Sequence, residues 1–291
     1  MNNFTIKDIE RLSGIKAHTL RIWEQRHGLC FCKRKESKHR YYDNEDLKEI
    51  LRIAFLYHNG YKVSKIATLS KDQIKLLSVT ATLEGNFDIY INQMIESSID
   101  FDQARFEKII HHAFLQLGFE KSVAKVLYPF MHKIGLLWIT QHVIPAQEHF
   151  SSHLILKKIL LAIDGLEEAV IKKDAVVLVY SPEKELHEIP LLVIQYILKK
   201  NGVSTVYFGP GIPVSELAYY CTHKPVTHIW FHFITNFLHQ DPQEYLNNLV
   251  NLFPEKKIIA SGPAMLGVKL TSPQTTLITS LEEFFLFHQN L

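Results

Sequence analysis

The chain has 291 residues, of which 47% are apolar and 21% are charged, with 12 Gly and 11 Pro. These values exclude a disordered or collagen-like protein, and the length predicts two or three globular domains. No apolar run reaches the roughly 18 residues of a membrane span, the first residues lack the pattern of a signal peptide, and three Cys are too few for a disulfide framework. We therefore expect a cytoplasmic protein without a membrane partner.

Charge is unevenly distributed along the chain. The formal net charge is +2, but residues 1–70 carry 14 Lys and Arg against 8 Asp and Glu, whereas the remaining residues carry 18 against 22. A basic head of net charge +6 on a body of net charge −4 suits a protein that binds a polyanion. An ordinary solvated surface explains the same charges, so composition alone leaves both interpretations open.

Residues 1–70 show short helical patterns with tight breaks between them. Thr5 and Asp8 have the spacing of a capping box at the start of a helix, which Ser13-Gly14 ends, and a second helix is expected over 17–25. A helix, a short turn with Gly and a second helix form the helix-turn-helix pattern. The head is expected to continue with a charged two-stranded wing over 33–40 and a third helix that Asp43-Asn44-Glu45-Asp46 caps.

The body is predicted to hold two further domains. Residues 71–170 have 3.6-residue periodicity and few breakers, which indicates a helical bundle. Residues 172–291 alternate β-branched runs with helical patterns, which indicates an α/β domain with a doubly wound parallel sheet. The expected helices are 71–79, 86–98, 102–117, 119–140, 144–165, 187–200, 214–223, 241–252 and one at the C-terminus, and the expected strands are 175–180, 203–208, 227–233, 257–260 and 276–279.

The head carries a set of motifs in a recognisable order and spacing, namely Thr5–Ile9, Ser13–Ile15, Thr19–Arg26, Gly28-Leu29 and His39–Asp43. On these residues it resembles the MerR family of transcription regulators over all of its 70 residues. The Trp-Glu-x-Arg version of the second helix is most similar to the branch with cobalamin-binding C-terminal domains, the CarH/LitR-like photoreceptor repressors. The resemblance implies a winged helix-turn-helix domain that binds double-stranded operator DNA as a homodimer or higher homo-oligomer.

The physics of DNA recognition agrees with this resemblance. The second helix of such a domain offers its N-terminal residues to base edges, and cations of the wing contact phosphates. A helical protein-binding module with a solvated basic loop is the alternative. The residues that we expect to bind DNA are Lys16, His18, Thr19, Arg21, Arg26, Lys33, Arg34, Lys35, Lys38, Arg40 and Tyr41.

The middle segment contains Trp138 followed, after nine residues, by Glu148-His149. This spacing resembles the helical half of cobalamin-binding photoreceptors, in which the Trp caps the upper face of the corrin and the Glu-His pair lies near the upper ligand. Ile139 stands where those photoreceptors carry the His that captures cobalt after light. A core position for Trp138, or a transition-metal site formed with His153, are the alternatives.

The third segment resembles the Rossmann-like domain of cobalamin-binding proteins. Its first loop reads Glu185-Leu186-His187 where the family has Asp-x-His, which implies that His187 is the lower ligand of cobalt. The family's nucleotide tail runs beside the third strand, past small residues that His232-Phe233 replace here, and we expect these two bulky side chains to fill that channel. Pro190 replaces a Gly, Ser261-Gly262 replace Gly-Gly, and Thr235 and Gly262 complete the expected cofactor-binding residues.

These observations predict a one-component transcription regulator rather than an enzyme. Its body would sense a ligand, adenosyl- or methylcobalamin, and thereby control oligomerisation and operator binding. An alternative keeps DNA binding but makes the body a degenerate, cofactor-free module that a protein partner controls. A subunit of a cobalamin-dependent methyltransferase or mutase is a third possibility, but no catalytic constellation in the sequence supports it.

Overall fold

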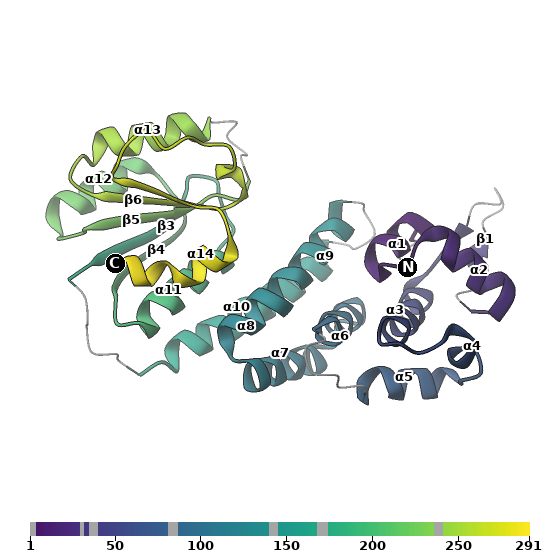
Figure 1. Cartoon of the computed structure of the whole chain (residues 1–291). Helices are drawn as coiled ribbons and strands as arrows, with labels where there is room; N and C mark the ends of the chain where they lie inside the picture. The colour runs from purple at the N-terminus through teal and green to yellow at the C-terminus, as the bar shows by residue number, and fades with distance from the viewer. Residues whose placement is uncertain are drawn as a thin grey trace. The chain divides into compact units, whose positions relative to one another are not determined.

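The computed structural model describes residues 4–29, 32–34, 40–80, 87–139, 145–167, 174–235 and 241–291, without side-chain detail at 34, 79, 80, 136–139 and 290. The chain forms two compact units, Met1–Leu154 and Ile155–Leu291 (Figure 1). Among the described helices, none combines the length and apolarity that a membrane span requires. The domain boundaries at 70 and 171 stay a prediction.

The head forms the expected helix-turn-helix with a small wing. The helix α1 (Ile6–Ser13) begins at a capping box of Thr5 and Asp8 and ends at Gly14, whose φ of 71° suits glycine. It is followed by α2 (Ala17–His27), by the antiparallel wing strands β1 (Lys33–Arg34) and β2 (Arg40–Tyr41), and by α3 (Asn44–His58), which a second capping box at Asp43 starts. A short helix α4 (Val63–Ile66) closes the head.

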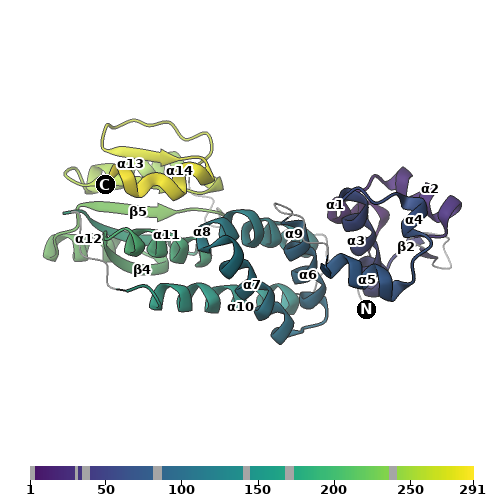
Figure 2. The same cartoon turned by 60° about the horizontal axis from the view of Figure 1, so that its bottom comes forward.

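The helices after the head differ in what they pack against. The first of them, α5 (Lys71–Thr80), packs on α3 of the head, whereas α6 (Asp88–Ile99) packs on α7 (Gln103–Leu117) and on α9 (Tyr128–Ile139) (Figure 2). The long α10 (Pro145–Asp164) is fixed to α6 by the hydroxyls of Ser98 and Ser151, 2.7 Å apart. The expected helical bundle is thus present.

The prediction of one uninterrupted helix over 119–140 is wrong, because a π-helical turn divides it. The structure has α8 (Phe119–Ser122), then a π-helical turn η1 (Val123–Leu127), then α9. At the end of this turn the Tyr128 N–H bonds the Val123 carbonyl, five residues back. Pro129 follows directly; it has no N–H to donate, and its ring would crowd the carbonyl four residues earlier in a regular helix. The wider turn relieves that conflict.

The second unit is a five-stranded parallel sheet in the order β4-β3-β5-β6-β7. Its strands are β3 (Val176–Pro182), β4 (Ser204–Ile212), β5 (His228–His232), β6 (Lys257–Ser261) and β7 (Thr275–Ile278). The helices α12 (Val214–His223) and α13 (Pro242–Leu252) cover one face of the sheet, and α11 (Ile189–Lys200) and α14 (Leu281–Leu286) cover the other (Figure 1). The two short turns of this unit are η2 (Pro263–Met265) and η3 (Phe287–Asn290). This is the predicted doubly wound fold.

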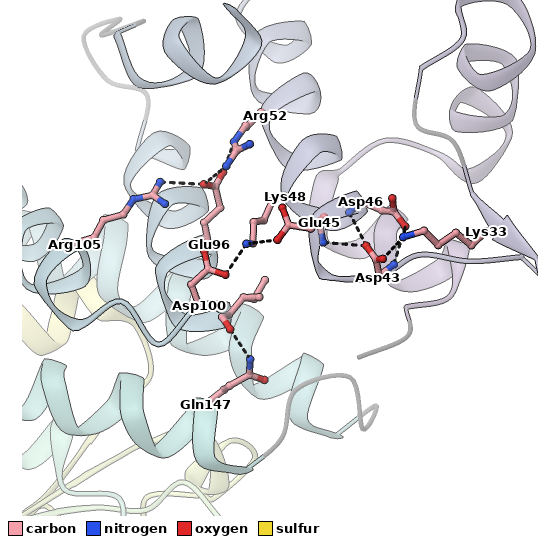
Figure 3. Close-up of polar contacts among 11 residues, drawn as sticks. Lys33, Asp43, Glu45, Asp46, Lys48, Arg52, Glu96, Asp100, Arg105 and Gln147 are labelled. Carbon is pink, nitrogen blue, oxygen red and sulfur yellow. Dashed lines mark hydrogen bonds and ion pairs between the residues drawn. The ribbon is translucent and has the colours of Figure 1, made fainter. Parts of the chain in front are cut away.

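A network of ion pairs joins the head to the helices after it. The carboxylate of Glu96 on α6, 3% exposed, accepts two hydrogen bonds from Arg52 of α3, at 2.9 and 2.7 Å, and one from Arg105 of α7 at 3.0 Å. Close by, the buried Lys48 ammonium of α3 contacts Asp100 at 2.5 Å and Glu45 at 2.8 Å. Figure 3 shows both groups of contacts between α3 and α6–α7. Buried charges are thus paired across this interface.

The start of β5 makes the second unit sensitive to acid. Burial, followed by the charge of Lys257, lowers the pKa of His228 from 6.5 to about 4. The unfolded chain therefore binds a proton at this residue between about pH 6.5 and 4 that the folded chain does not, and the free energy of unfolding falls as pH falls through this window, by on the order of 2–3 kcal/mol. Urea unfolding of wild type and His228→Gln at pH 7 and 4.5 tests this. The substitution should flatten the pH dependence, and an unchanged dependence would contradict the assignment.

Candidate functional site

The topology of the sheet marks a candidate position for a site at its carboxyl edge. The chain leaves β3 toward β4 on one side and returns to β5 on the other, so the strand order reverses between β3 and β5. Parallel α/β sheets bind ligands outside the carboxyl ends of the strands at such a point. The loop 183–188 follows β3 and residues 233–235 follow β5. These two loops carry the polar residues of the candidate site.

Glu185 joins these two loops. Its carboxylate is 2% exposed; Oε1 lies 2.5 Å from Nδ1 of His187 and accepts the His187 N–H at 3.2 Å. The other oxygen, Oε2, accepts the N–H groups of Ile234 at 3.0 Å and Thr235 at 2.7 Å, and the Thr235 hydroxyl at 3.2 Å. Burial alone would raise the pKa of Glu185, but the hydrogen bonds from His187 and Thr235 outweigh burial and lower it to about 2. Glu185 is therefore ionised.

The His187 side chain, 48% exposed, is held on its Nδ1 side by the Glu185 carboxylate. A carboxylate on Nδ1 favours the tautomer in which Nε2 carries the lone pair, and it raises the basicity of the ring. The extra methylene of Glu185 does not prevent this contact; it lets one carboxylate reach both loops. The donor set on this side fits an axial ligand of cobalt.

The side of the sheet next to this pair is filled with side chains. Trp230, fully buried on β5, donates from Nε1 to the Ser261 hydroxyl at 2.9 Å, and Nδ1 of His232 contacts the same hydroxyl at 2.8 Å. The rings of both residues meet Phe284 of α14 edge to face, with centroids 5.7 and 6.1 Å apart. Burial lowers the pKa of His232 to about 4, so this imidazole is neutral at pH 7. The residues here do not fit a long ligand tail beside β5.

The expectation that Phe233 fills the same space is wrong. Successive residues of a strand point to opposite faces of a sheet. Phe233 packs with Phe231 and with Tyr245 of α13, in the core on the face that α12 and α13 cover. Gly262 serves this packing too, because with its φ of 107° a Cβ atom there would come within 2.3 Å of the Phe233 carbonyl oxygen.

In the head, α2 buries Leu20 and Trp23 and exposes the opposite face. His18, Arg21 and Arg26 lie on the exposed face, Lys16 precedes the helix and is exposed, and Thr19 is half-buried with its hydroxyl 3.3 Å from His18 Nε2. The Lys16 ammonium contacts Glu10 at 3.0 Å. Of the residues expected at base edges, His18 and Arg21 are therefore exposed on α2, Thr19 is half-buried, and Lys16 lies just before the helix.

The wing residues are more constrained than the sequence predicts. Lys33 forms ion pairs with Asp43 and Asp46, and the Arg40 guanidinium binds Glu24 of α2 at 3.1 Å and the Cys32 sulfur at 3.2 Å. These cations are engaged within the head and fix the wing to α2 and α3. Tyr41 is half-buried, and the side chain of the next residue, Tyr42, is buried in the core. The side chain of Arg34, and Lys35 and Lys38 altogether, lie outside the described residues.

The comparisons with known proteins match the head and the helices that follow it. Residues 4–73 match the MerR HTH family regulatory proteins and residues 90–161 match the B12 binding domain. The chain is 23% identical over 221 residues to the HTH-type transcriptional repressor CarH of Myxococcus xanthus. The aligned region covers 74% of this chain and 73% of that protein. It is 26% identical to the repressor CarA of the same organism, over 74% of this chain and 71% of that protein.

The chain carries a MerR helix-turn-helix domain and a B12-binding domain, and it is homologous to CarH and CarA. These relatives are repressors, which confirms the expectation of a regulator rather than an enzyme. The fold resembles that of the monomethylamine corrinoid protein of Methanosarcina barkeri, with a TM-score of 0.54 and 14% identity over 69% of this chain and 98% of that chain.

The structure brings only some of the expected B12-binding residues together. Glu185, His187 and Thr235 meet at the carboxyl edge of the sheet in the second unit. Glu148 and His149 lie on α10 within the first unit, 3.5 Å apart, with His149 largely exposed, and the side chain of Trp138 is outside the described part. Within the described ranges no three His, Cys, Asp or Glu side chains are grouped to hold a metal ion, so the transition-metal alternative with His153 gains no support there.

Sequence reasoning missed Trp230 and Phe284, which line the site from β5 and α14. The signal available for Trp230 was its spacing of two from His232, which places both on one face of the strand. No local pattern links Phe284 to them, because the contact joins segments more than fifty residues apart.

Proposed function

We propose that this protein is a DNA-binding transcription regulator of the cytoplasm whose second unit holds a corrinoid through His187. The observation that carries the proposal is the buried carboxylate of Glu185 on Nδ1 of His187, at the strand-order reversal of the sheet. Metal-ligating imidazoles usually donate their second ring N–H to a carboxylate or carbonyl, so a partly exposed imidazole with this support is suited to be a metal ligand.

In the second unit, one residue would bind the metal of such a ligand and others would hold that residue in position. His187 offers one ring nitrogen to the metal, and Glu185 sets its tautomer and its position. Ile234 and Thr235 hold the carboxylate through their N–H groups, so the loop after β5 is part of the support. When bound, a corrinoid supplies a cobalt ion whose upper ligand can be exchanged.

Regulation follows if the ligand favours one assembly state of the protein over another. A ligand that binds two states with different affinity shifts the population between them, and the affinity for DNA changes by the same coupling free energy. We propose a homodimer or higher homo-oligomer as the DNA-binding form, as two-fold operators require. If no corrinoid binds, the body is a cofactor-free module and only the DNA-binding part of the proposal stands.

The DNA-binding part rests on the exposed face of α2. Arg21→Ala should cost about 1–3 kcal/mol on an operator selected from random duplexes, and the loss should depend on sequence, because a base contact is removed. Lys35→Ala should weaken binding to all duplexes alike and reduce the slope of log affinity against log salt by about one. Fluorescence anisotropy at several salt concentrations measures both effects.

Lys224→Ala is the matched control for both variants. Lys224 is an exposed cation of the second unit, so this variant loses the same charge without touching the head. It should bind DNA as wild type does. If Arg21→Ala and Lys35→Ala also bind as wild type does, α2 and the wing do not read DNA.

A further inference from the structure

The strand β5 presents different side chains to the two faces of the sheet. Phe231 and Phe233 enter the core beneath α12 and α13. Trp230 and His232 face the other side, where the Trp230 ring meets Phe284 and Phe287 with centroids 5.7 and 5.0 Å apart. The space between β5 and the C-terminal helix is therefore occupied by packed aromatic rings.

Hydrogen bonds fix these rings in place. The Ser261 hydroxyl receives the Trp230 indole N–H, contacts Nδ1 of His232 and donates to the Phe231 carbonyl at 3.2 Å. We call Trp230, His232, Ser261 and Phe284 the β5 plug. Because its polar atoms bond to one another, opening the plug would break these bonds as well as the ring contacts.

The β5 plug is continuous with the loop that holds the carboxylate of Glu185, the partner of His187. His232 is the last residue of β5, and the N–H groups of Ile234 and Thr235, two and three residues further on, bind the Glu185 carboxylate. The plug thus lies on the strand that leads directly into the support of His187.

This position matters for the chemistry of the ligand. When a protein imidazole takes the lower axial place on cobalt, the base at the end of the cobalamin tail must leave that place and find room in the protein on the same side of the ring. The resemblance places that room beside the third strand of the sheet, which is β5. Here the rings of the plug fill it, whereas the contact between Glu185 and His187, the proposed ligand, is intact.

We infer that this site takes a corrinoid without the nucleotide tail, a cobinamide, in preference to cobalamin, with His187 as axial ligand and the β5 plug as the element that excludes the tail. The inference rests on the proposed function, because it assumes that His187 binds a corrinoid.

The test titrates the full-length protein with aquocobinamide and with aquocobalamin and follows the absorption spectrum of the corrinoid. Wild type should bind aquocobinamide at least tenfold more tightly, with the spectral shift of nitrogen ligation. His187→Ala should lose that shift and most of the affinity. Affinities that are equal for the two corrinoids in wild type, and that fall in His187→Ala, would overturn the inference and leave the proposed function standing.

Variants of the plug test its role directly. His232→Ser is the milder change and Trp230→Leu the larger one, and each should raise the affinity for aquocobalamin at least fivefold while changing that for aquocobinamide little. Phe231→Leu is the matched control, since Phe231 is as deeply buried as Trp230 on the same strand but faces the opposite side. It should leave the preference unchanged, and circular dichroism checks that each variant is folded.

The remaining outcomes are distinct. If folded wild type binds neither corrinoid, the corrinoid part of the proposed function fails and the inference fails with it. If His187→Ala binds aquocobinamide as wild type does, the axial assignment is wrong. A third outcome concerns the plug alone. If wild type prefers aquocobinamide, but His232→Ser and Trp230→Leu change that preference no more than the control Phe231→Leu does, the plug does not set the preference.

Discussion

Glu185→Gln should lower the affinity of the protein for a corrinoid by about 10–100-fold and should also destabilise the second unit. Support of a metal-ligating His by a carboxylate contributes an effect of this size in metal sites. The loss of stability follows from the pKa of about 2, which lies below the ordinary value of 4.5. The ionised carboxylate is stabilised on folding by on the order of 3 kcal/mol relative to the neutral group, and glutamine is neutral.

The same pKa fixes the pH window of this contribution. A carboxyl whose folded pKa is depressed stabilises the protein fully above its unfolded pKa of about 4.5 and loses that contribution as pH falls to about 2. Urea unfolding at pH 7 and titration with aquocobinamide measure the two effects of Glu185→Gln. At pH 2.5 the difference in stability between the variant and wild type should be much smaller than at pH 7.

Glu188→Gln is the control for this prediction. Glu188 is a carboxylate of the same loop, and it accepts one hydrogen bond from the Tyr207 hydroxyl at 3.1 Å rather than supporting His187. It should change corrinoid affinity by less than about threefold and stability by about 1 kcal/mol. Equal behaviour of the two glutamine variants would show that charge near the loop, and not the contact with His187, is what matters.

Glu96→Ala should destabilise the first unit by about 3–5 kcal/mol, because it leaves the partly buried Arg52 and Arg105 without their shared carboxylate. The contacts join α3 of the MerR domain to α6 and α7, so the variant should lose packing of α3 against these two helices. Urea unfolding gives the free energy, and hydrogen exchange on α3 and α6 shows where protection is lost.

Glu45→Gln tests whether burial is the cause of that effect. Glu45 also belongs to an ion pair of α3, with Lys48, but its side chain is 78% exposed. An exposed pair contributes about 0–1 kcal/mol, so this variant should be close to wild type in stability. A loss for Glu96→Ala no larger than that for Glu45→Gln would show that the buried network does not hold α3 against α6.

The elements of this protein were predictable from local patterns. The capping boxes at Thr5 and Asp43 mark helix starts by residues three apart, and the structure has both. The buried strands were visible as short β-branched runs, and β3, β5 and β6 lie within two residues of the expected ranges. Such signals depend on neighbours in sequence, which is why they suffice without knowledge of the tertiary contacts.

The parts that sequence could not predict depend on contacts between distant segments. The plug requires the packing of α14 on β5, and the engagement of Lys33 and Arg40 requires that the wing meet Asp43 and Glu24. A basic residue in a loop has the same local pattern whether it faces a phosphate or a carboxylate of its own domain. The assignment of Phe233 failed for a related reason, since the face of a strand is set by register.

The turn at Gly262 limits how this site can evolve. A side chain at that position would collide with the carbonyl of residue 233, so the turn after β6, which packs against the end of β5, admits glycine and little else. The side chains of Trp230 and His232 are under no such restriction from the backbone. Substitution of a few ring-bearing residues would therefore alter which molecules fit at the carboxyl edge of the sheet, while the frame that positions His187 stays in place.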